Sequence, residues 1–314
     1  MKGVLPFIAP PDFSQEAEWI AALQAAMPDE SVMPLAALDD AAREACTVAV
    51  VANPRPQDLR RLPRLQWVQS VWAGVERMLA DLGDTKLKVV RLVDPQLADT
   101  MAEAVLAWTL YLHRDMPRYA SQQRERLWQP QDYVRPQDRT VGLLGLGALG
   151  EAAARRLIAA GFKVQGWSRS LRDMAGLKCH AGDSGLAEML ASTDILVCLL
   201  PLTAQTRGLL NDATLGRLRR RASLINFSRG AVIDDEALRR ALDDGALRHA
   251  VLDVFATEPL PADNWHWAHP AVTVLPHISA PTDRQTASCI VAAHVAAYRR
   301  HGVIPAHVDR GRGY

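Results

Sequence analysis

The sequence lacks the charge imbalance and the long apolar runs that mark several classes of protein. Its lysines and arginines number 36 against 35 aspartates and glutamates, a net charge of +1 over 314 residues. Binding to nucleic acid or to an anionic membrane surface relies on an excess of positive charge, and this chain has almost none. No apolar run reaches the about 18 residues of a membrane-spanning helix. We therefore expect neither nucleic acid nor a membrane as a partner.

Cysteine is also scarce. The chain has four, and neither they nor the nine histidines show the spacing of metal ligands, so we expect no metal site. Cys198 lies in the apolar run I-L-V-C-L-L, which is typical of a reduced, packed thiol. The N-terminal residues M-K-G-V-L-P-F lack the longer apolar core and cleavage site of a signal peptide. These absences favour a cytoplasmic protein.

What the sequence does contain is a repeated alternation of strand-like and helix-like stretches. Such alternation predicts parallel βαβ units, and 314 residues are enough for two domains of about 150. The fold class predicted is α/β with two doubly wound parallel sheets. A flavodoxin-like domain is expected over 1–97, completed by 280–314, and a Rossmann domain over 98–279. A long apolar helix over 99–114 is expected to connect them, and 122–138 to form a loop or a dimer contact.

The individual elements are expected as follows. The first domain should contain strands at 4–8, 47–51, 65–71 and 87–92, with helices at 14–27 and 75–80. The second should contain strands beginning at Thr140 and at 163–167, 195–200, 223–226, 250–254 and 272–275. Its helices are expected near 151–160, 185–191, 211–218 and 234–244. A last helix after Pro281 should return to the first domain.

The clearest motif is a glycine-rich turn between a strand and a helix, T-V-G-L-L-G-L-G-A-L-G, which ends at Gly150. In a dinucleotide-binding turn, Gly145 permits the tight bend and Gly147 lets the backbone approach a pyrophosphate, while Gly150 packs helix against strand. Ala148 and Leu149 begin the helix, whose first N–H groups and positive dipole end suit phosphate. We interpret these five residues as cofactor-binding. A glycine-rich loop without a ligand is the competing interpretation.

The next predicted strand bears on the choice of cofactor. NAD-binding folds place an acidic residue at the end of this strand, where it accepts hydrogen bonds from the ribose hydroxyls. Here Ser168 and Arg169 stand at that point. An arginine pairs with a 2′-phosphate, whereas an aspartate would repel it. This favours NADPH, with NADH as a less preferred cofactor. An exposed turn arginine with weak selectivity is the alternative.

Three polar residues follow the ends of predicted strands, where ligands bind in open α/β sheets. They are Arg229, Glu258 and His277. Reduction of a 2-keto acid needs a proton donor, and histidine titrates in a suitable range. Glu258 could orient the ring and raise its pKa, and the planar fork of Arg229 could hold a carboxylate. The backbone of Ala73, Gly74 and Val75 could donate to the same carboxylate.

In these motifs the chain resembles the D-isomer-specific 2-hydroxyacid dehydrogenases over nearly its whole length. Within that family it is most similar to the short bacterial glyoxylate/hydroxypyruvate reductases of the A type. The segments that carry the resemblance are G-L-G-A-L-G at 145–150, W-S-R at 167–169, P-L-T-A-Q-T at 201–206, N-F-S-R-G at 226–230, D-V-F-A-T-E-P at 253–259, W-A-H-P at 267–270, P-H at 276–277 and the tail V-D-R-G-R-G-Y at 308–314.

The resemblance implies a homodimer with an active site in the cleft between a substrate domain and a cofactor domain. It implies Arg229, Glu258 and His277 as the catalytic set. Its implied cofactor contacts on the nicotinamide side are Leu200, Pro201, Thr206, Asp253 and Ser279, with Met101 close by. Phe227 stands where the family more often has a small residue, so it either narrows this side or packs away from it. The segment from Trp72 to Val75 is expected to meet the substrate.

One departure keeps the substrate open. The reductases of the A type tend to carry Trp-His before a proline where this chain has Ala52 and Asn53. Glyoxylate and hydroxypyruvate are the leading substrates, and larger 2-keto acids are an alternative. Formate dehydrogenase chemistry needs no acid, so the Glu258 and His277 pair argues against it. A non-catalytic protein that senses NADPH is the alternative from a different class.

Overall fold

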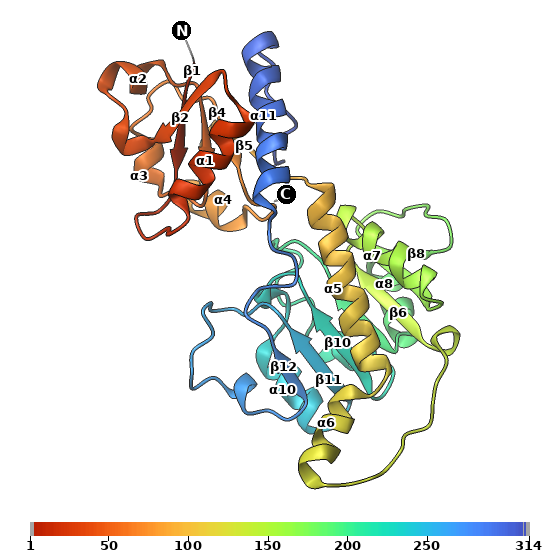
Figure 1. Ribbon diagram of the computed structural model, residues 1–314. Coiled ribbons are helices and arrows are strands. Elements are labelled where there is room, and N and C mark those ends of the chain that lie inside the picture. Colours follow the sequence, from red (N-terminus) through yellow and green to blue (C-terminus); the bar gives the residue numbers. More distant parts are fainter. Residues whose placement is uncertain (1–2, 310, 312–314) are drawn as a thin grey trace. The chain divides into compact units, whose positions relative to one another are not determined.

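The computed structural model describes residues 3–309 and 311, and the chain divides into two compact units (Figure 1). Unit 1 comprises Met1–Gln96 and Thr282–Tyr314, and unit 2 comprises Leu97–Pro281. Residues 1–2, 310 and 312–314 lie outside the described residues, and with them most of the tail quoted for the resemblance.

Unit 1 is built on a parallel sheet with the strand order β2-β1-β3-β4-β5 within its described residues. This is the flavodoxin-like order, in which the direction of winding reverses at β1, with β2 on one side and β3 on the other. The central strands are buried on both faces, as the apolar runs V-A-V-V and V-L-P-F-I require. The strands are β1 (Gly3–Ile8), β2 (Glu30–Pro34), β3 (Val48–Val51), β4 (Trp67–Ser70) and β5 (Lys88–Val90).

Helices from both ends of the chain cover this sheet. Figure 1 shows α11 beside α1, and Ala287, Val291 and Val295 of α11 share a buried cluster with Trp19 of α1. Asp283 accepts a hydrogen bond from Thr286 N and so caps α11. The helices of unit 1 are α1 (Glu16–Ala26), α2 (Asp40–Ala45), α3 (Pro56–Leu59), α4 (Glu76–Leu82) and α11 (Arg284–His301), with a 3₁₀ turn η1 (Leu35–Ala37).

Unit 2 contains a larger parallel sheet, with the order β12-β11-β10-β9-β6-β7-β8. The first of its strands in the chain, β6, lies between β7 and β9, so the direction of winding reverses beside β6. Dinucleotides bind outside the carboxyl ends of the strands at such a switch point. The strands are β6 (Thr140–Leu144), β7 (Lys163–Ser168), β8 (Lys178–Ala181), β9 (Ile195–Cys198), β10 (Ala222–Asn226), β11 (Leu247–Leu252) and β12 (Val272–Val274).

The helix α5 packs on the sheet of unit 2 along an apolar face. Met101, Ala102 and Val105 share a buried cluster with Val141 and Leu143 of β6. The described helices of this unit are α5 (Pro95–His113, which starts at the boundary), α6 (Met116–Glu125), α7 (Ala148–Ala159), α8 (Gly182–Ala191), α9 (Asp212–Leu215) and α10 (Asp235–Asp243), with 3₁₀ turns η2 (Pro136–Asp138), η3 (Gly230–Val232) and η4 (Trp265–Trp267).

Two short edge strands and three helices, α2, α3 and α6, are absent from what the sequence predicts. The strands β2 and β8 are absent from the predicted set, because neither has a long apolar run. A loop or a dimer contact is predicted over 122–138, yet α6 extends to Glu125, so the loop alternative is wrong for 122–125. Its glutamines, arginine and glutamate favour a helix intrinsically but provide no apolar periodicity from which to recognise one.

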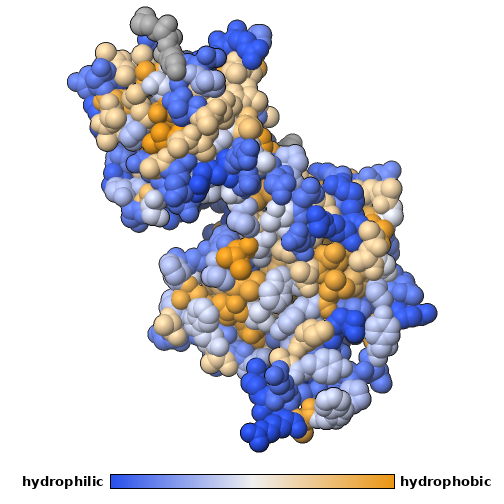
Figure 2. Space-filling model, in the orientation of Figure 1, coloured by the Kyte–Doolittle hydropathy of each residue, from blue (hydrophilic) through white to orange (hydrophobic). Residues whose placement is uncertain are grey.

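Large apolar side chains lie on the surface after α6. Trp128 is fully exposed, and Leu127 and Tyr133 are more than half exposed. Where Figure 1 places α6, Figure 2 shows strongly hydrophilic and hydrophobic residues next to one another.

Within residues 3–309 and 311, no helix is long and apolar enough to cross a membrane.

Candidate active site

The glycine turn after β6 has the geometry that its sequence predicts. Gly145 has φ +102°, a conformation that side chains disfavour, and its N–H donates to Trp167 O at 2.9 Å. A Cβ on Gly150 would lie 1.9 Å from Gly145 O, so only glycine lets α7 start so close to the strand. The helix α7 begins at Ala148 and continues through Leu149 and Gly150.

Two features at this edge fit a nucleotide with a nicotinamide. A Cβ built on Gly147 would meet no described atom within 4 Å, so the backbone there has room for a phosphate group. The hydroxyl Oγ of Ser279 is buried and has no hydrogen-bond partner among the described residues. A buried hydroxyl costs free energy unless it is bonded, so a polar group of a bound molecule is a suitable partner for it. The residues present therefore fit a dinucleotide.

The end of β7 lacks a carboxylate. Ser168 is its last residue, and its Oγ donates to Ser170 O at 2.8 Å, which closes a tight turn. Arg169 follows on the surface. A negatively charged 2′-phosphate would meet a hydroxyl and a guanidinium here rather than an acid.

The imidazole of His277 and the carboxylate of Glu258 form a hydrogen-bonded pair. Nδ1 of His277 lies 2.8 Å from Oε2 of Glu258. The other oxygen, Oε1, accepts from Phe255 N at 2.9 Å, which fixes the carboxylate against its own loop. With Nδ1 directed at the carboxylate, Nε2 is the ring atom available for proton transfer.

The pair shifts the pKa of both partners. The hydrogen bond to Glu258 raises the pKa of His277 above 6.5, more than burial and nearby Arg229 lower it. Burial by itself raises the pKa of Glu258, but the hydrogen bonds from His277 and from Phe255 N outweigh it, so that pKa is lowered. The geometry therefore favours an imidazolium beside a carboxylate.

Arg229 lies in the loop after β10 (Ala222–Asn226). Its Nη1 donates to Ser228 O at 2.6 Å, and its charge affects the pKa of both Glu258 and His277, which places the three groups in one neighbourhood. Gly230 follows, and a Cβ there would lie 2.0 Å from the carbonyl carbon of Phe255. The Arg229 loop thus lies directly against the Glu258 loop.

Asp253 holds the segment that follows His277. Its two carboxylate oxygens accept from Ile278 N at 2.7 Å and Ser279 N at 2.9 Å. His277 itself has φ +55°, a conformation that costs free energy for a residue other than glycine. The buried carboxylate of Asp253 stabilises this backbone. The sequence alone predicts Asp253 only as a cofactor contact.

The other predicted cofactor residues lie in two settings. Thr206 donates from Oγ1 to Pro201 O at 2.6 Å and accepts from Thr203 N at 2.8 Å, so its hydroxyl shapes the loop after β9. Leu200 is buried beside that loop. Met101 of α5 and Phe227 are both buried in the same core cluster, and the packed position of Phe227 is one of the two that the sequence leaves open.

Unit 1 contains the segment predicted to meet the substrate. Trp72 to Val75 follow β4 at the carboxyl edge of its sheet, and Trp72 N donates to Ser70 Oγ at 3.0 Å. The Trp72 ring packs edge-on against Trp19, with centroids 5.6 Å apart. Ala73 and Gly74 are half-buried, and Val75 is buried where α4 begins.

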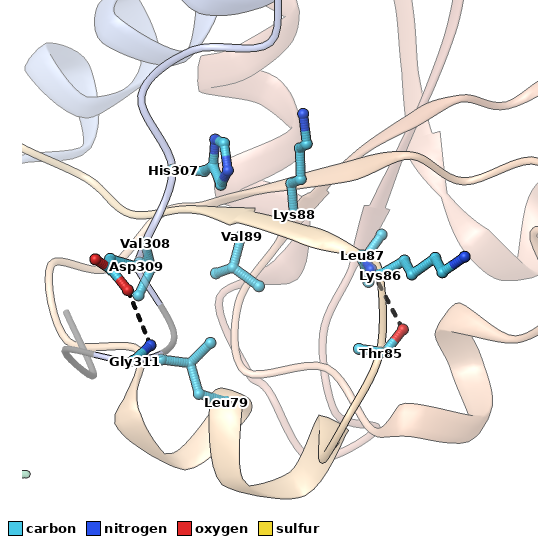
Figure 3. A pocket seen from close by; sticks show the side chains of 10 residues that line it. All are labelled: Leu79, Thr85, Lys86, Leu87, Lys88, Val89, His307, Val308, Asp309 and Gly311. Carbon is cyan, nitrogen blue, oxygen red and sulfur yellow. Dashed lines mark hydrogen bonds between the residues drawn. The ribbon is translucent and has the colours of Figure 1, made fainter.

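A surface hollow of unit 1 involves none of these residues. It is lined by Leu79 of α4, the segment 85–89 and the C-terminal residues His307, Val308, Asp309 and Gly311 (Figure 3). Lys86 and Lys88 extend away from it rather than converging in it.

Among the described residues, no three His, Cys, Asp or Glu side chains are grouped so that they could hold a metal ion.

Comparison with known proteins agrees with the geometry. The family model for the NAD-binding domain of D-isomer specific 2-hydroxyacid dehydrogenases matches residues 106–279. A glyoxylate/hydroxypyruvate reductase A from Serratia proteamaculans is 36% identical over 304 residues, which cover 95% of this chain and 96% of the relative.

Solved structures resemble the whole chain as well. A D-isomer specific 2-hydroxyacid dehydrogenase from Xanthobacter autotrophicus, in complex with NADPH and MES, is 37% identical with a TM-score of 0.92, covering 100% of both chains. An NADPH-dependent glyoxylate/hydroxypyruvate reductase from Sinorhizobium meliloti, in complex with NADP and sulfate, is 35% identical with a TM-score of 0.90 and the same coverage. The chain belongs to the family of D-isomer specific 2-hydroxyacid dehydrogenases.

Proposed function

We propose that this protein catalyses the NADPH-dependent reduction of small 2-keto acids, glyoxylate to glycolate and hydroxypyruvate to D-glycerate. The observation that carries the proposal is the hydrogen-bonded pair of His277 and Glu258, beside Arg229 in the same unit as the glycine turn. The names of the similar reductases support the choice of substrate.

His277 is the proton donor in this proposal. Its raised pKa favours the protonated ring, in which Nε2 carries a proton for the keto oxygen as that oxygen gains charge. Glu258 holds Nδ1–H and stabilises the imidazolium, and Phe255 N keeps the carboxylate in place. After transfer the ring is neutral and takes a proton from solvent.

Arg229 binds the substrate. Its guanidinium offers planar, paired donors for a carboxylate and for the adjacent keto oxygen. When bound, NADPH supplies the hydride. The backbone of Ala73, Gly74 and Val75 as a second donor set for the carboxylate stays a prediction of the sequence.

The chain's residues favour NADPH over NADH. Gly145, Gly147 and Gly150 would hold the pyrophosphate at the start of α7, and Ser168 with Arg169 would accept the 2′-phosphate. Ser279, whose hydroxyl has no partner among the described residues, is the candidate for a hydrogen bond on the nicotinamide side. NADH lacks the phosphate and is expected to bind more weakly.

We also propose that the protein is a cytoplasmic homodimer. The exposed Trp128, Leu127 and Tyr133 support a contact with a second copy, because single chains rarely expose such large apolar side chains together. Sedimentation at several concentrations tests this, and a monomer at all of them would count against it.

The experiment that tests the reaction is an absorbance assay. Purified protein is mixed with NADPH or NADH and with glyoxylate, hydroxypyruvate, pyruvate or phenylpyruvate, and the loss of reduced nicotinamide is followed. We expect turnover with the two smallest keto acids and a lower KM for NADPH. A preference for phenylpyruvate would favour the alternative that the protein is a dehydrogenase of larger 2-keto acids. NADPH affinity without any turnover would favour a non-catalytic binding protein.

A further inference from the structure

The side chain of Asn226 is completely buried at the end of β10, three residues before Arg229. Its Oδ1 accepts from Ser228 N at 3.1 Å and from Ser228 Oγ at 2.7 Å. Its Nδ2 donates to Arg229 O at 3.1 Å. All of these contacts go to the loop that carries the arginine.

The orientation of this amide follows from its partners. Ser228 N can only donate and Arg229 O can only accept, so the oxygen and the nitrogen of the amide have one consistent arrangement. A side chain at this position needs both an acceptor and a donor. Aspartate has the same shape as asparagine but has no donor when ionised, and it would direct a negative charge at Arg229 O.

The backbone of Asn226 anchors these side-chain contacts in the sheet. It pairs with Cys198 of β9 and Leu252 of β11 (Leu247–Leu252), and its carbonyl accepts from Asp253 N at 3.1 Å. Asp253 in turn holds the segment after His277. One buried residue of the sheet therefore connects the loop of Arg229 with Asp253, which follows β11 and holds the segment after His277.

The Arg229 loop has little freedom to compensate if the hydrogen bonds from the Asn226 side chain are weakened. On its other side Gly230 lies so close to the Phe255 backbone that even a Cβ would clash. A change in the turn between Asn226 and Gly230 is therefore transmitted to the Cα of Arg229. Displacements of about 1 Å at a substrate-holding group can cost on the order of a hundredfold in rate.

We propose that Asn226 is a positioning residue that sets the place of the Arg229 guanidinium relative to His277. This inference rests on the proposed function, in which Arg229 holds the keto acid. Asn226 itself touches neither substrate nor cofactor in this role. It acts by holding Ser228 N and Arg229 O from the rigid end of β10.

The test compares Asn226→Asp with Gln165→Glu and Arg229→Ala. Gln165 is a matched control because its amide is also buried in unit 2, and Nε2 donates to Met189 O at 2.9 Å, away from the Arg229 loop. For each variant we would measure kcat and KM for glyoxylate, the NADPH Kd by fluorescence, and the Tm.

If Asn226 positions Arg229, Asn226→Asp lowers kcat/KM for glyoxylate by about tenfold or more while the NADPH Kd changes by less than about twofold. Gln165→Glu should lower the Tm comparably and leave kcat/KM near wild type. Equal losses of kcat/KM in the two variants overturn the inference. So does a rise in the NADPH Kd of Asn226→Asp that accounts for its loss of kcat/KM.

Arg229→Ala separates this inference from the proposed function. If that variant is unimpaired, the role assigned to Arg229 fails and the inference fails with it. If it is impaired but Asn226→Asp behaves like Gln165→Glu, only the inference fails. Should Asn226→Asp not fold, Asn226→Ser removes the amide that joins Ser228 to Arg229 O without adding a charge. It must then show a smaller loss of kcat/KM with the NADPH Kd unchanged.

Discussion

Nδ1 of His277 lies 2.8 Å from Oε2 of Glu258, and the hydrogen bond between them raises the pKa of the histidine. The two residues are 19 positions apart and follow different strands, β12 (Val272–Val274) and β11. Parallel strands bring them together, since the carboxyl ends of neighbouring strands meet at one edge of the sheet.

Replacement of His277 by alanine should abolish most of the turnover. Loss of a positioned proton donor lowers kcat by about 10²- to 10⁴-fold, whereas NADPH binding should be retained. Steady-state kinetics with glyoxylate and a fluorescence titration with NADPH check both points. His269→Gln is the control, because His269 also lies outside the helices and strands but its Nε2 pairs with Asp243. Normal kcat in His277→Ala would exclude His277 as the donor.

Glu258→Gln should shift the pH dependence of the reduction. The active form has His277 protonated, so kcat/KM is highest at low pH and falls as pH rises through the folded-state pKa, which lies above 6.5. Removing the carboxylate removes the cause that raises this pKa, and the falling limb moves to lower pH. A pH profile from 5 to about 9 measures it. Glu188→Gln, beside His180, should leave the profile unchanged.

Asp253→Asn should loosen the segment after His277. The asparagine can accept from one of Ile278 N and Ser279 N but turns an NH₂ group toward the other. A buried donor without a partner costs about 1–3 kcal/mol, which urea unfolding would detect, and kcat should fall as well. The control is Asp39→Asn, an exposed helix cap where asparagine serves equally well. Similar small effects in both variants would contradict the role of Asp253.

Arg169→Gln should reduce the preference for NADPH. A lost charge-assisted hydrogen bond to the 2′-phosphate is worth about a tenfold to hundredfold rise in the KM for NADPH, with little change for NADH. Arg155→Gln, an arginine on α7 that pairs with Glu151, is the control and should alter neither KM. Equal changes for both cofactors would place the 2′-phosphate elsewhere.

The protein should lose stability in mild acid. Burial lowers the pKa of His249 to about 4 and that of His266 also to about 4. Between pH 6.5 and about 4 the unfolded chain binds protons that the folded protein excludes, so stability falls as pH falls through this window, by up to about 3 kcal/mol per histidine. His249→Gln should flatten the fall in urea titrations, while exposed His301→Gln should not.

Much of the fold is predictable from local patterns. Apolar runs such as V-A-V-V and I-L-V-C mark strands buried on both faces, and glycine and proline mark their ends. The edge strands β2 and β8 and the polar helix α6 escape prediction for one reason. Their stability depends on neighbours distant in sequence, and their own side chains are half exposed, so no period stands out.

The candidate site is predictable in its residue types but not in its supports. Arg229, Glu258 and His277 follow predicted strands and belong to recognisable motifs. The contacts of Asn226 and Asp253 depend on where a buried side chain points at the end of a strand, which neither spacing nor composition specifies. The positive φ of His277 is equally hard to predict, since most histidines do not adopt it.

The close approach of Gly230 to Phe255 limits how this enzyme can vary. Gly208 and Gly245 have φ +62° and +65° and open space around them, so larger residues there meet only backbone strain. At Gly230 a single methyl group would overlap a neighbouring peptide. A saturation library should therefore tolerate some replacements at positions 208 and 245 and almost none at 230. Changes in substrate range therefore have to come from substitutions at the surrounding residues, because position 230 tolerates no larger side chain.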